Sequence, residues 1–388
     1  MLTAMIIGIW SMIFLGGLMR GMMVGMINNG ISTLTGDIQI HAKGYRDDPS
    51  IEYFMPDLKG IEKTINKILP RGSRYTSRIR VNAIAANARH STGVTMVGIH
   101  PVKEPGISFI GPGAVVQGRY LVPGNNNGIL IGRAMAEKFG TQTGHKIILM
   151  SENIHHDIAS KAFIIKGIFK AEMQSTEKHF VFVTSSSARH MLKLAKGASE
   201  ISIILPHHKG DKKIAWNLRQ AIPDSYEIHT WQELLPILTS YLKMFDGFMY
   251  IWFLVIFIAM GFGIVNTTLM AVYERMKEFG LLKALGMRPW LIIRSVLLES
   301  FMLLVIGTAI GNFMGFLTIH FLSITGINLT SLSAGAEFAG LSRIIYPVLY
   351  PKDIIMANVV VIGLGLVVSL YPAVKAARFT PVEALSHE

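Results

Sequence analysis

Four long apolar stretches and one long polar stretch divide the chain. The apolar stretches comprise residues 1–35, 243–272, 291–325 and 353–374. Each contains at least the ~20 residues that an α-helix needs to cross the hydrocarbon core of a bilayer at ~1.5 Å per residue. The pattern therefore predicts four transmembrane helices, with the polar residues 36–242 lying outside the membrane between the first helix and the second.

Short strand-like runs alternate with helix-like segments within residues 36–242. Residues 94–99 and 163–169 have the apolar, β-branched character of strands, whereas 58–69 and 212–221 have a helical period. Such a mixture is typical of an α+β domain. The predicted fold is thus a membrane protein with four transmembrane helices and a large extracytoplasmic α+β domain between helices 1 and 2.

A short charged segment, residues 273–290, separates the second apolar stretch from the third. Its charged and apolar residues interleave as in an amphipathic helix, and Gly286 and Pro289 are expected to end that helix. A Lys/Arg excess in a short loop predicts a cytoplasmic location, and the loop and its flank supply five such residues: Arg275, Lys277, Lys283, Arg288 and Arg294. Both termini are then cytoplasmic, with residues 375–388 as a tail and 326–352 as an extracytoplasmic loop. The helix either binds a peripheral partner or only sets topology.

The composition narrows the possible chemistry. The chain has no cysteine and a net charge of +12, but its basic residues are scattered without interleaved aromatic residues, so the sequence favours anionic lipid head groups over nucleic acid. No G-x-x-x-x-G-K-[ST], G-x-S-x-G or H-E-x-x-H motif occurs, and we predict no catalytic residue. Adjacent strand residues point to opposite faces, so we predict no metal site at two polar clusters: His155, His156 and Asp157, and the pair His207 and His208.

Two glycine ridges suit close helix packing within the apolar stretches. They consist of Gly17, Gly21 and Gly25, and of Gly307, Gly311 and Gly315. Arg20 is the only charge in the first stretch and is expected at the outer interface. Glu299 either pairs with a basic residue nearby, such as Arg294 or one in the charged segment, or forms part of an ion path.

The charged segment resembles the coupling segment of the FtsX-like permeases of ABC transporters, a family that includes MacB, LolC and LolE. The resemblance rests on E-R-x-x-E-F-G-L-L-K-A-L-G-M at residues 274–287. In that family this helix contacts the ATPase subunit. The resemblance therefore implies a role in ATPase coupling for Glu274, Arg275, Lys277, Glu278, Phe279, Gly280, Leu281, Lys283, Ala284, Leu285 and Gly286.

The polar stretch is similar to the external domain of LolC and LolE in the order and spacing of five motifs. These are GRY at 118–120, GILIG at 128–132, GHKIIL at 144–149, IIKGIF at 164–169 and FVFV at 180–183. The resemblance implies two lobes, one inserted in the other at about residues 118–196. Family members usually begin with a basic cytoplasmic segment, so either residues precede Met1 or this segment is missing.

The resemblance implies a permease subunit, itself not an enzyme and without a cofactor, in the bacterial inner membrane. ATP and Mg would be bound by two copies of a separate ABC ATPase, and a second permease subunit, identical or homologous, would complete the transporter. Membrane lipid and a periplasmic carrier or adaptor are further expected partners. The chain resembles LolC and LolE in its length and in its lack of the fused ATPase that MacB-type chains normally carry, so the expected cargo is lipoprotein or other lipidated cargo. The residues expected to contact this cargo are Met22, Met26, Phe248, Met249, Trp252 and Phe253. MacB-like efflux of drugs or peptides, or FtsX-like regulation of a cell-wall hydrolase, remain alternatives.

Overall fold

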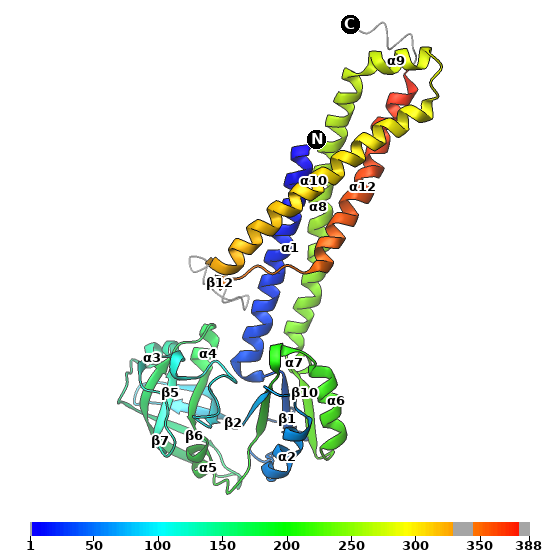
Figure 1. Cartoon of the computed structure of the whole chain (residues 1–388). Coiled ribbons are helices and arrows are strands. Elements are labelled where there is room, and N and C mark those ends of the chain that lie inside the picture. Colours follow the sequence, from blue (N-terminus) through cyan, green and yellow to red (C-terminus); the bar gives the residue numbers. More distant parts are fainter. Residues whose placement is uncertain (1, 329–343, 380–388) are drawn as a thin grey trace. The chain divides into compact units, whose positions relative to one another are not determined.

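The computed structural model describes residues 2–328 and 344–379. These residues form two compact units. Within the described residues, the membrane unit comprises 2–25, 241–328 and 344–379, and the α+β unit comprises 26–240. Figure 1 shows the elements of both.

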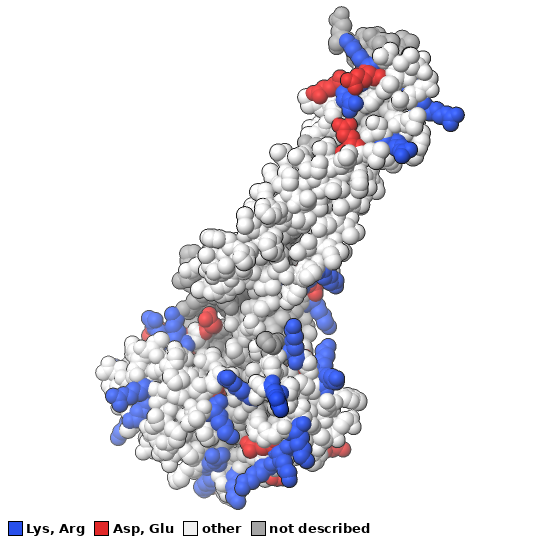
Figure 2. Space-filling view, viewed as in Figure 1, with Lys and Arg blue, Asp and Glu red and all other residues white. Residues whose placement is uncertain are grey.

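The membrane unit is built from long helices, four of which are long and apolar enough to cross a membrane. They are α1 (Leu2–Gly30), α8 (Pro236–Glu274), α10 (Pro289–Thr325) and α12 (Pro351–Arg378). A short helix, α9 (Met276–Ala284), joins α8 to α10, and β11 (Ile327–Asn328) pairs with β12 (Ile344–Ile345). Figure 2 shows an almost uncharged surface along the long helices. The prediction of four transmembrane helices is confirmed.

The long helices pack through methionine, isoleucine and glycine. Met5, Ile9 and Met12 of α1 lie in one buried cluster with Met249, Phe253, Phe257 and Met260 of α8. On the α10 side, a Cβ added to Gly311 would lie 2.9 Å from the Cβ of Ile9, and one added to Gly315 would lie 2.7 Å from Cγ2 of Ile13. A larger side chain at either glycine would therefore push α1 and α10 apart.

The first ridge of glycines makes different contacts. A Cβ at Gly17 would collide with the side chain of Ile319, and one at Gly21 with the backbone of Tyr346. In the second ridge, the remaining glycine, Gly307, faces Met5 of α1. The expected packing role of Gly25 stays a prediction.

One lobe of the α+β unit is a sheet covered by two helices. Strand β1 (Ile38–Ala42) pairs antiparallel with β9 (Glu200–Ile204) and with β10 (Tyr226–Thr230), and β9 also pairs with the first part of β2 (Arg74–Ala86). Isoleucines from these strands share a buried cluster with α2 (Leu58–Ile68) and α6 (Asp211–Ala221). The chain then leaves β10 through the short helix α7 (Trp231–Leu234).

The second lobe is a closed ring of six strands. Its pairing order is β2, β3, β8, β5, β7, β6 and back to β2. Besides β2, the ring contains β3 (Ser91–Ile99), β5 (Gly128–Gly132), β6 (Lys146–Glu152), β7 (Ile158–Phe169) and β8 (Phe180–Thr184). Strand β4 (Val115–Gly118) pairs with β7. The lobe also contains three helices, α3 (Arg133–Phe139), α4 (Gln174–His179) and α5 (Ser185–Met191).

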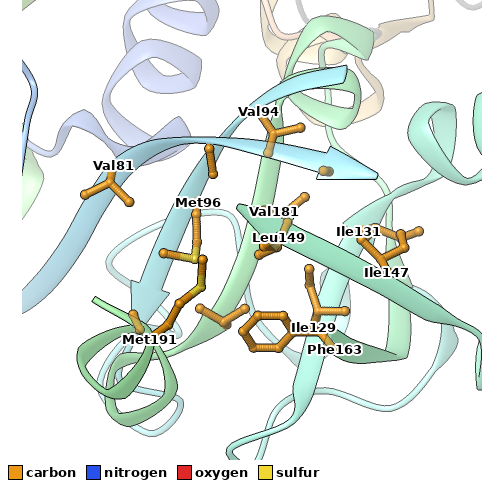
Figure 3. Packing of buried hydrophobic residues seen from close by; sticks show 14 of the residues in the cluster. Val81, Val94, Met96, Ile129, Ile131, Ile147, Leu149, Phe163, Val181 and Met191 are labelled. Carbon is orange, nitrogen blue, oxygen red and sulfur yellow. The ribbon is translucent and has the colours of Figure 1, made fainter. Parts of the chain in front are cut away.

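Alternate residues of each strand fill the ring. Val81, Ala83 and Ala85 of β2 are buried at a period of two, as expected for a strand with one face inside. Figure 3 shows such residues converging with Phe163 and Met191. The ring needs β2 and β3, which precede Gly118, so the segment 118–196 expected as an inserted lobe does not form this core alone.

A buried charge cluster lies where β2 passes from one lobe to the other. Arg78 donates from Nη2 to Oε1 of Glu104 at 2.7 Å and from Nη1 to Oε1 of Glu200 at 3.1 Å, and all three side chains are inaccessible to solvent. Its Nη1 also donates to the carbonyl oxygen of Leu34. Burial alone would lower the pKa of Arg78, but the carboxylates of Glu104 and Glu200 raise it, so the guanidinium stays charged.

We predict that Arg78→Leu destabilises the α+β unit by about 3–5 kcal/mol, because the buried carboxylates of Glu104 and Glu200 would lose the cation that donates hydrogen bonds to both. Arg80→Leu is the matched control on the same strand, since the Arg80 side chain is 35% exposed and its Nη1 lies 3.8 Å from Glu200. Its loss should change stability by less than about 1 kcal/mol. Urea titration of the detergent-solubilised chain, read by protease resistance of residues 26–240, measures both. Equal effects of the two substitutions would contradict the assigned role.

Candidate functional site

Helix α9 is set off from its neighbours by a break at each end. Arg275 leaves the helical region with φ −101° and ψ 14°, which separates α8 from α9. After α9, Gly286 adopts φ +90°, a conformation that favours glycine, and Pro289 is the first residue of α10. The chain therefore turns from one long helix to the next through an isolated short helix.

One face of α9 is packed against the ends of the long helices. Phe279 is buried in a cluster with Val272 of α8, Val296 of α10 and Ala376 of α12. Lys283 donates from Nζ to the carbonyl oxygens of Ala377 at 2.9 Å and Phe379 at 2.6 Å. A cation at this position satisfies carbonyl groups that the end of α12 leaves unpaired. Helix α9 thus contacts three of the long helices.

The opposite face of α9 is exposed. It carries Lys277, Glu278, Leu281 and Ala284 at helical spacings of three and four. Two exposed residues flank it, which are Glu274 at the end of α8 and Leu285 directly after α9. Leu281 is 55% exposed and Leu285 77% exposed. Within the described part of the membrane unit, this face combines exposed leucines with charged residues in the manner of a protein-binding surface.

The eleven residues predicted for coupling therefore do not all lie on the exposed face. Phe279 and Gly280 are buried, and Lys283 is turned toward α12. Arg275 donates from Nε to Glu278 at 3.0 Å and from Nη1 to Glu299 of α10 at 3.1 Å. Glu299 thus pairs with a basic residue of the charged segment, one of the two alternatives left open by the sequence.

A second charged cluster joins three long helices and was not foreseen. Arg20 of α1 forms a two-point contact with Asp353 of α12, at 2.7 and 3.0 Å, and donates to Asp246 of α8 at 2.7 Å. Its guanidinium also lies 5.4 Å from the ring centre of Tyr350. The sequence placed Arg20 at an interface, but its partners are 226 and 333 residues away in the chain. The only available signal was that Arg20 is the single charge in an apolar helix.

The six residues expected to contact cargo do not share one surface. Met249 and Phe253 are buried, and Phe253 packs beside Gly16 of α1. Phe248 and Trp252 lie on the exposed side of α8, at 45% and 50% exposure. The remaining two, on α1, are Met22, which is half-buried, and Met26, which is buried.

The polar clusters of the α+β unit contact charged side chains nearby. His156 lies 2.8 Å from Glu52 and 2.6 Å from Glu152, and Lys193 pairs with Asp157. His208 contacts the buried carboxylate of Asp37 at 2.9 Å. Among the described residues, no group of three or more His, Cys, Asp or Glu side chains is arranged to hold a metal ion.

We predict that the two aspartates around Arg20 contribute unequally to the stability of the membrane unit. The Asp353 side chain is 12% exposed and that of Asp246 is 48% exposed. Asp353→Asn should therefore destabilise by about 1.5–3 kcal/mol, and Asp246→Asn, a matched change at a more solvated site, by less than about 1 kcal/mol. Thermal denaturation in detergent, followed by size-exclusion chromatography, gives the order. A larger loss with Asp246→Asn would overturn this ranking.

Comparisons with known proteins agree with this architecture. The family model described as MacB-like periplasmic core domain matches residues 1–209, and the one described as FtsX-like permease C-terminal matches residues 250–381. The lipoprotein-releasing system transmembrane protein LolC of Neisseria meningitidis serogroup B is 23% identical over 79% of this chain and 76% of its own length. LolC of Xylella fastidiosa strain Temecula1 is 25% identical over 82% of this chain and 79% of its own length.

A third relative matches only in part. The macrolide export ATP-binding/permease protein MacB of Syntrophobacter fumaroxidans is 30% identical over 44% of this chain and 22% of its own length. The MacB-like periplasmic core domain alone accounts for more than half of the present chain. With its four apolar helices and its α+β unit, the chain belongs to the family of FtsX-like, MacB-type ABC transporter permeases.

Proposed function

We propose that this chain is the permease subunit of a transporter that moves or extracts lipoprotein, or other lipidated cargo, at the outer face of the bacterial inner membrane. Two copies of a separate ABC ATPase would bind ATP and Mg and supply the energy. The observation that carries the proposal is the exposed face of α9, an isolated helix that contacts the ends of three membrane helices. In the proposed orientation, the basic segment around α9 lies in the cytoplasm together with both termini, and the α+β unit lies in the periplasm.

The contacts of α9 explain how a push from an ATPase would reach the membrane helices. A partner bound at Leu281 and Leu285 would press on a short helix whose other face holds Phe279 and Lys283. Phe279 packs against α8, α10 and α12, and Lys283 binds the end of α12. Because packed interiors are stiff, displacement of α9 would be passed to these helix ends.

We predict that Leu281→Glu weakens binding of the ATPase by about tenfold or more, since burying an unpaired carboxylate in an apolar contact is unfavourable. The matched control is Trp216→Glu, an equally drastic change at a side chain that is 61% exposed on α6. The measurement is co-purification of an ATP-hydrolysing subunit with the tagged chain. Retention of that subunit by the Leu281 variant would argue against α9 as the docking helix.

Cargo selection is proposed from the likeness to LolC and from the exposed side of α8. Phe248 and Trp252 present aromatic side chains on a helix long enough to span a bilayer. They are available to an acyl chain, or to a second permease subunit, whereas Met249 and Phe253 are already buried within this chain. We therefore narrow the α8 part of the proposed cargo contact to Phe248 and Trp252.

A photoreactive amino acid at position 248 should capture lipidated protein in living cells, because this side chain is exposed. The same group at buried position 249 is the control and should capture none. Adducts that contain only phospholipid at both positions would count against lipidated cargo.

Efflux of drugs or peptides is a second candidate, favoured by the MacB-like core domain over residues 1–209. Deleting the gene distinguishes the two. Accumulation of lipoprotein in the inner membrane supports the first function, and hypersensitivity to small toxic molecules without such accumulation supports the second.

A further inference from the structure

A cavity of about 230 Å³ opens between α8, α9 and α10, beside the charged segment. Its apolar walls include Phe279 of α9, Val296 and Leu303 of α10, and its polar groups include Thr267, Arg275 and Glu299. On α8, Thr267 lies seven residues before Glu274, a distance of about 10 Å along the helix axis. The cavity thus runs from the charged end of the helices into the apolar part of the membrane unit.

The size and shape of this cavity restrict its occupant. Pockets for whole drug-sized ligands are typically about 300–1,000 Å³, whereas an apolar cavity of about 150 Å³ already holds a small hydrocarbon. A volume between these values suits part of a larger molecule. The lining is charged at Arg275 and Glu299, and beyond them it is mainly apolar, with Ala271, Val272 and Leu303 beside Thr267 and Thr268. The fitting molecule is therefore an amphiphile with its polar group at Arg275 and Glu299.

The charges at the polar end favour one class of head group. The guanidinium of Arg275 is shared between two carboxylates, those of Glu278 and Glu299, so these three side chains carry a net charge of −1. An anionic head group would be repelled by the surplus carboxylate. A head group with both an ammonium and a phosphate finds a partner for each, because the ammonium can donate to Glu299 while the released fork of Arg275 binds phosphate.

We propose that this cavity binds one zwitterionic, amine-bearing phospholipid from the surrounding bilayer leaflet. The ammonium group donates hydrogen bonds to Glu299, the phosphate accepts from Arg275, and the start of an acyl chain lies against Ala271 and Leu303, which line the cavity farther from the charged segment. A quaternary choline has no N–H to donate, so the site distinguishes phosphatidylethanolamine from phosphatidylcholine.

The site has a consequence for coupling, which rests on the function proposed above. Phe279 forms both a wall of the cavity and the packed face of α9. A bound lipid therefore supports α9 from the membrane side and limits how far an ATPase can push it inward. Lipid composition would then adjust the efficiency of coupling.

The test uses the purified full chain, without any ATPase, in an equimolar mixture of phosphatidylethanolamine, phosphatidylcholine and phosphatidylglycerol. Native mass spectrometry counts the lipid retained after detergent washing. The chain should retain one phosphatidylethanolamine with a preference of about fivefold or more over phosphatidylcholine, the effect of one net hydrogen bond. Glu299→Gln, at a side chain that is 53% exposed, should reduce this preference without unfolding the chain, because the amide oxygen accepts a weaker hydrogen bond than the carboxylate.

A second pair of variants tests the cavity itself. Ser300→Trp places a large ring at a buried lining position and should remove the retained lipid, whereas Met302→Trp, at a side chain that is 66% exposed on the same helix, should not. Equal retention of the three lipids by the unaltered chain, or an unchanged preference in Glu299→Gln, would overturn the proposal. Because no ATPase is present, these outcomes are independent of whether α9 is the docking helix.

Discussion

Helices inside a membrane associate without the hydrophobic driving force that folds soluble proteins, and the membrane unit reflects this constraint throughout. Lipid chains are as apolar as the side chains that they would replace, so close packing and polar contacts hold the helices together. Gly307, Gly311 and Gly315 let α1 approach α10. Asn312 of α10 donates to Asn358 of α12 at 2.9 Å, and Trp10 of α1 donates to Thr318 of α10 at 3.0 Å.

The same constraint explains why charge is confined to two places among the described parts of the long helices and α9. Near one end, Arg20 joins α1, α8 and α12 through two aspartates. Near the other, Phe279 and Lys283 of α9 tie together the ends of α8, α10 and α12. Helices α8 and α12 are therefore linked at both places. A displacement that enters at α9 would move linked helices instead of being absorbed by one loose helix end.

The sequence was informative wherever a single segment determines its own structure. The apolar runs predicted the spans, because their length and composition suffice, and the charged residues 274–287 predicted an amphipathic helix. Which side of each helix is buried was harder to predict. Met249 and Phe253 were grouped with Phe248 and Trp252, yet only the first two are buried, with Phe253 packed beside Gly16 of α1. Which side of an apolar helix becomes buried depends on its neighbours, and the apolar pattern of α8 alone does not specify them.

Contacts between distant segments were the least predictable. The six-stranded ring closes through β2 and β6, whose paired residues lie more than sixty positions apart. Motifs read in chain order therefore placed the lobe boundary at Gly118, whereas β2 already passes from the first lobe into the ring. Arg78 gave no signal of burial, because a lone arginine in a strand is usually exposed. Its partners Glu104 and Glu200 come from a loop and another strand.

The positions of the charged residues also matter for the choice of lipid head group, which the net charge alone does not determine. A net charge of +12 and five basic residues around α9 favour anionic lipid head groups when counted together. In the structure, however, Arg275 is neutralised by Glu278 and Glu299, and Lys283 is turned toward the carbonyl groups of α12. Two of the five basic residues are thus already engaged within the chain. Electrostatic interactions weaken with distance and with solvent screening, so the local pairing at the cavity decides which head group it accepts, and the total charge of the chain does not.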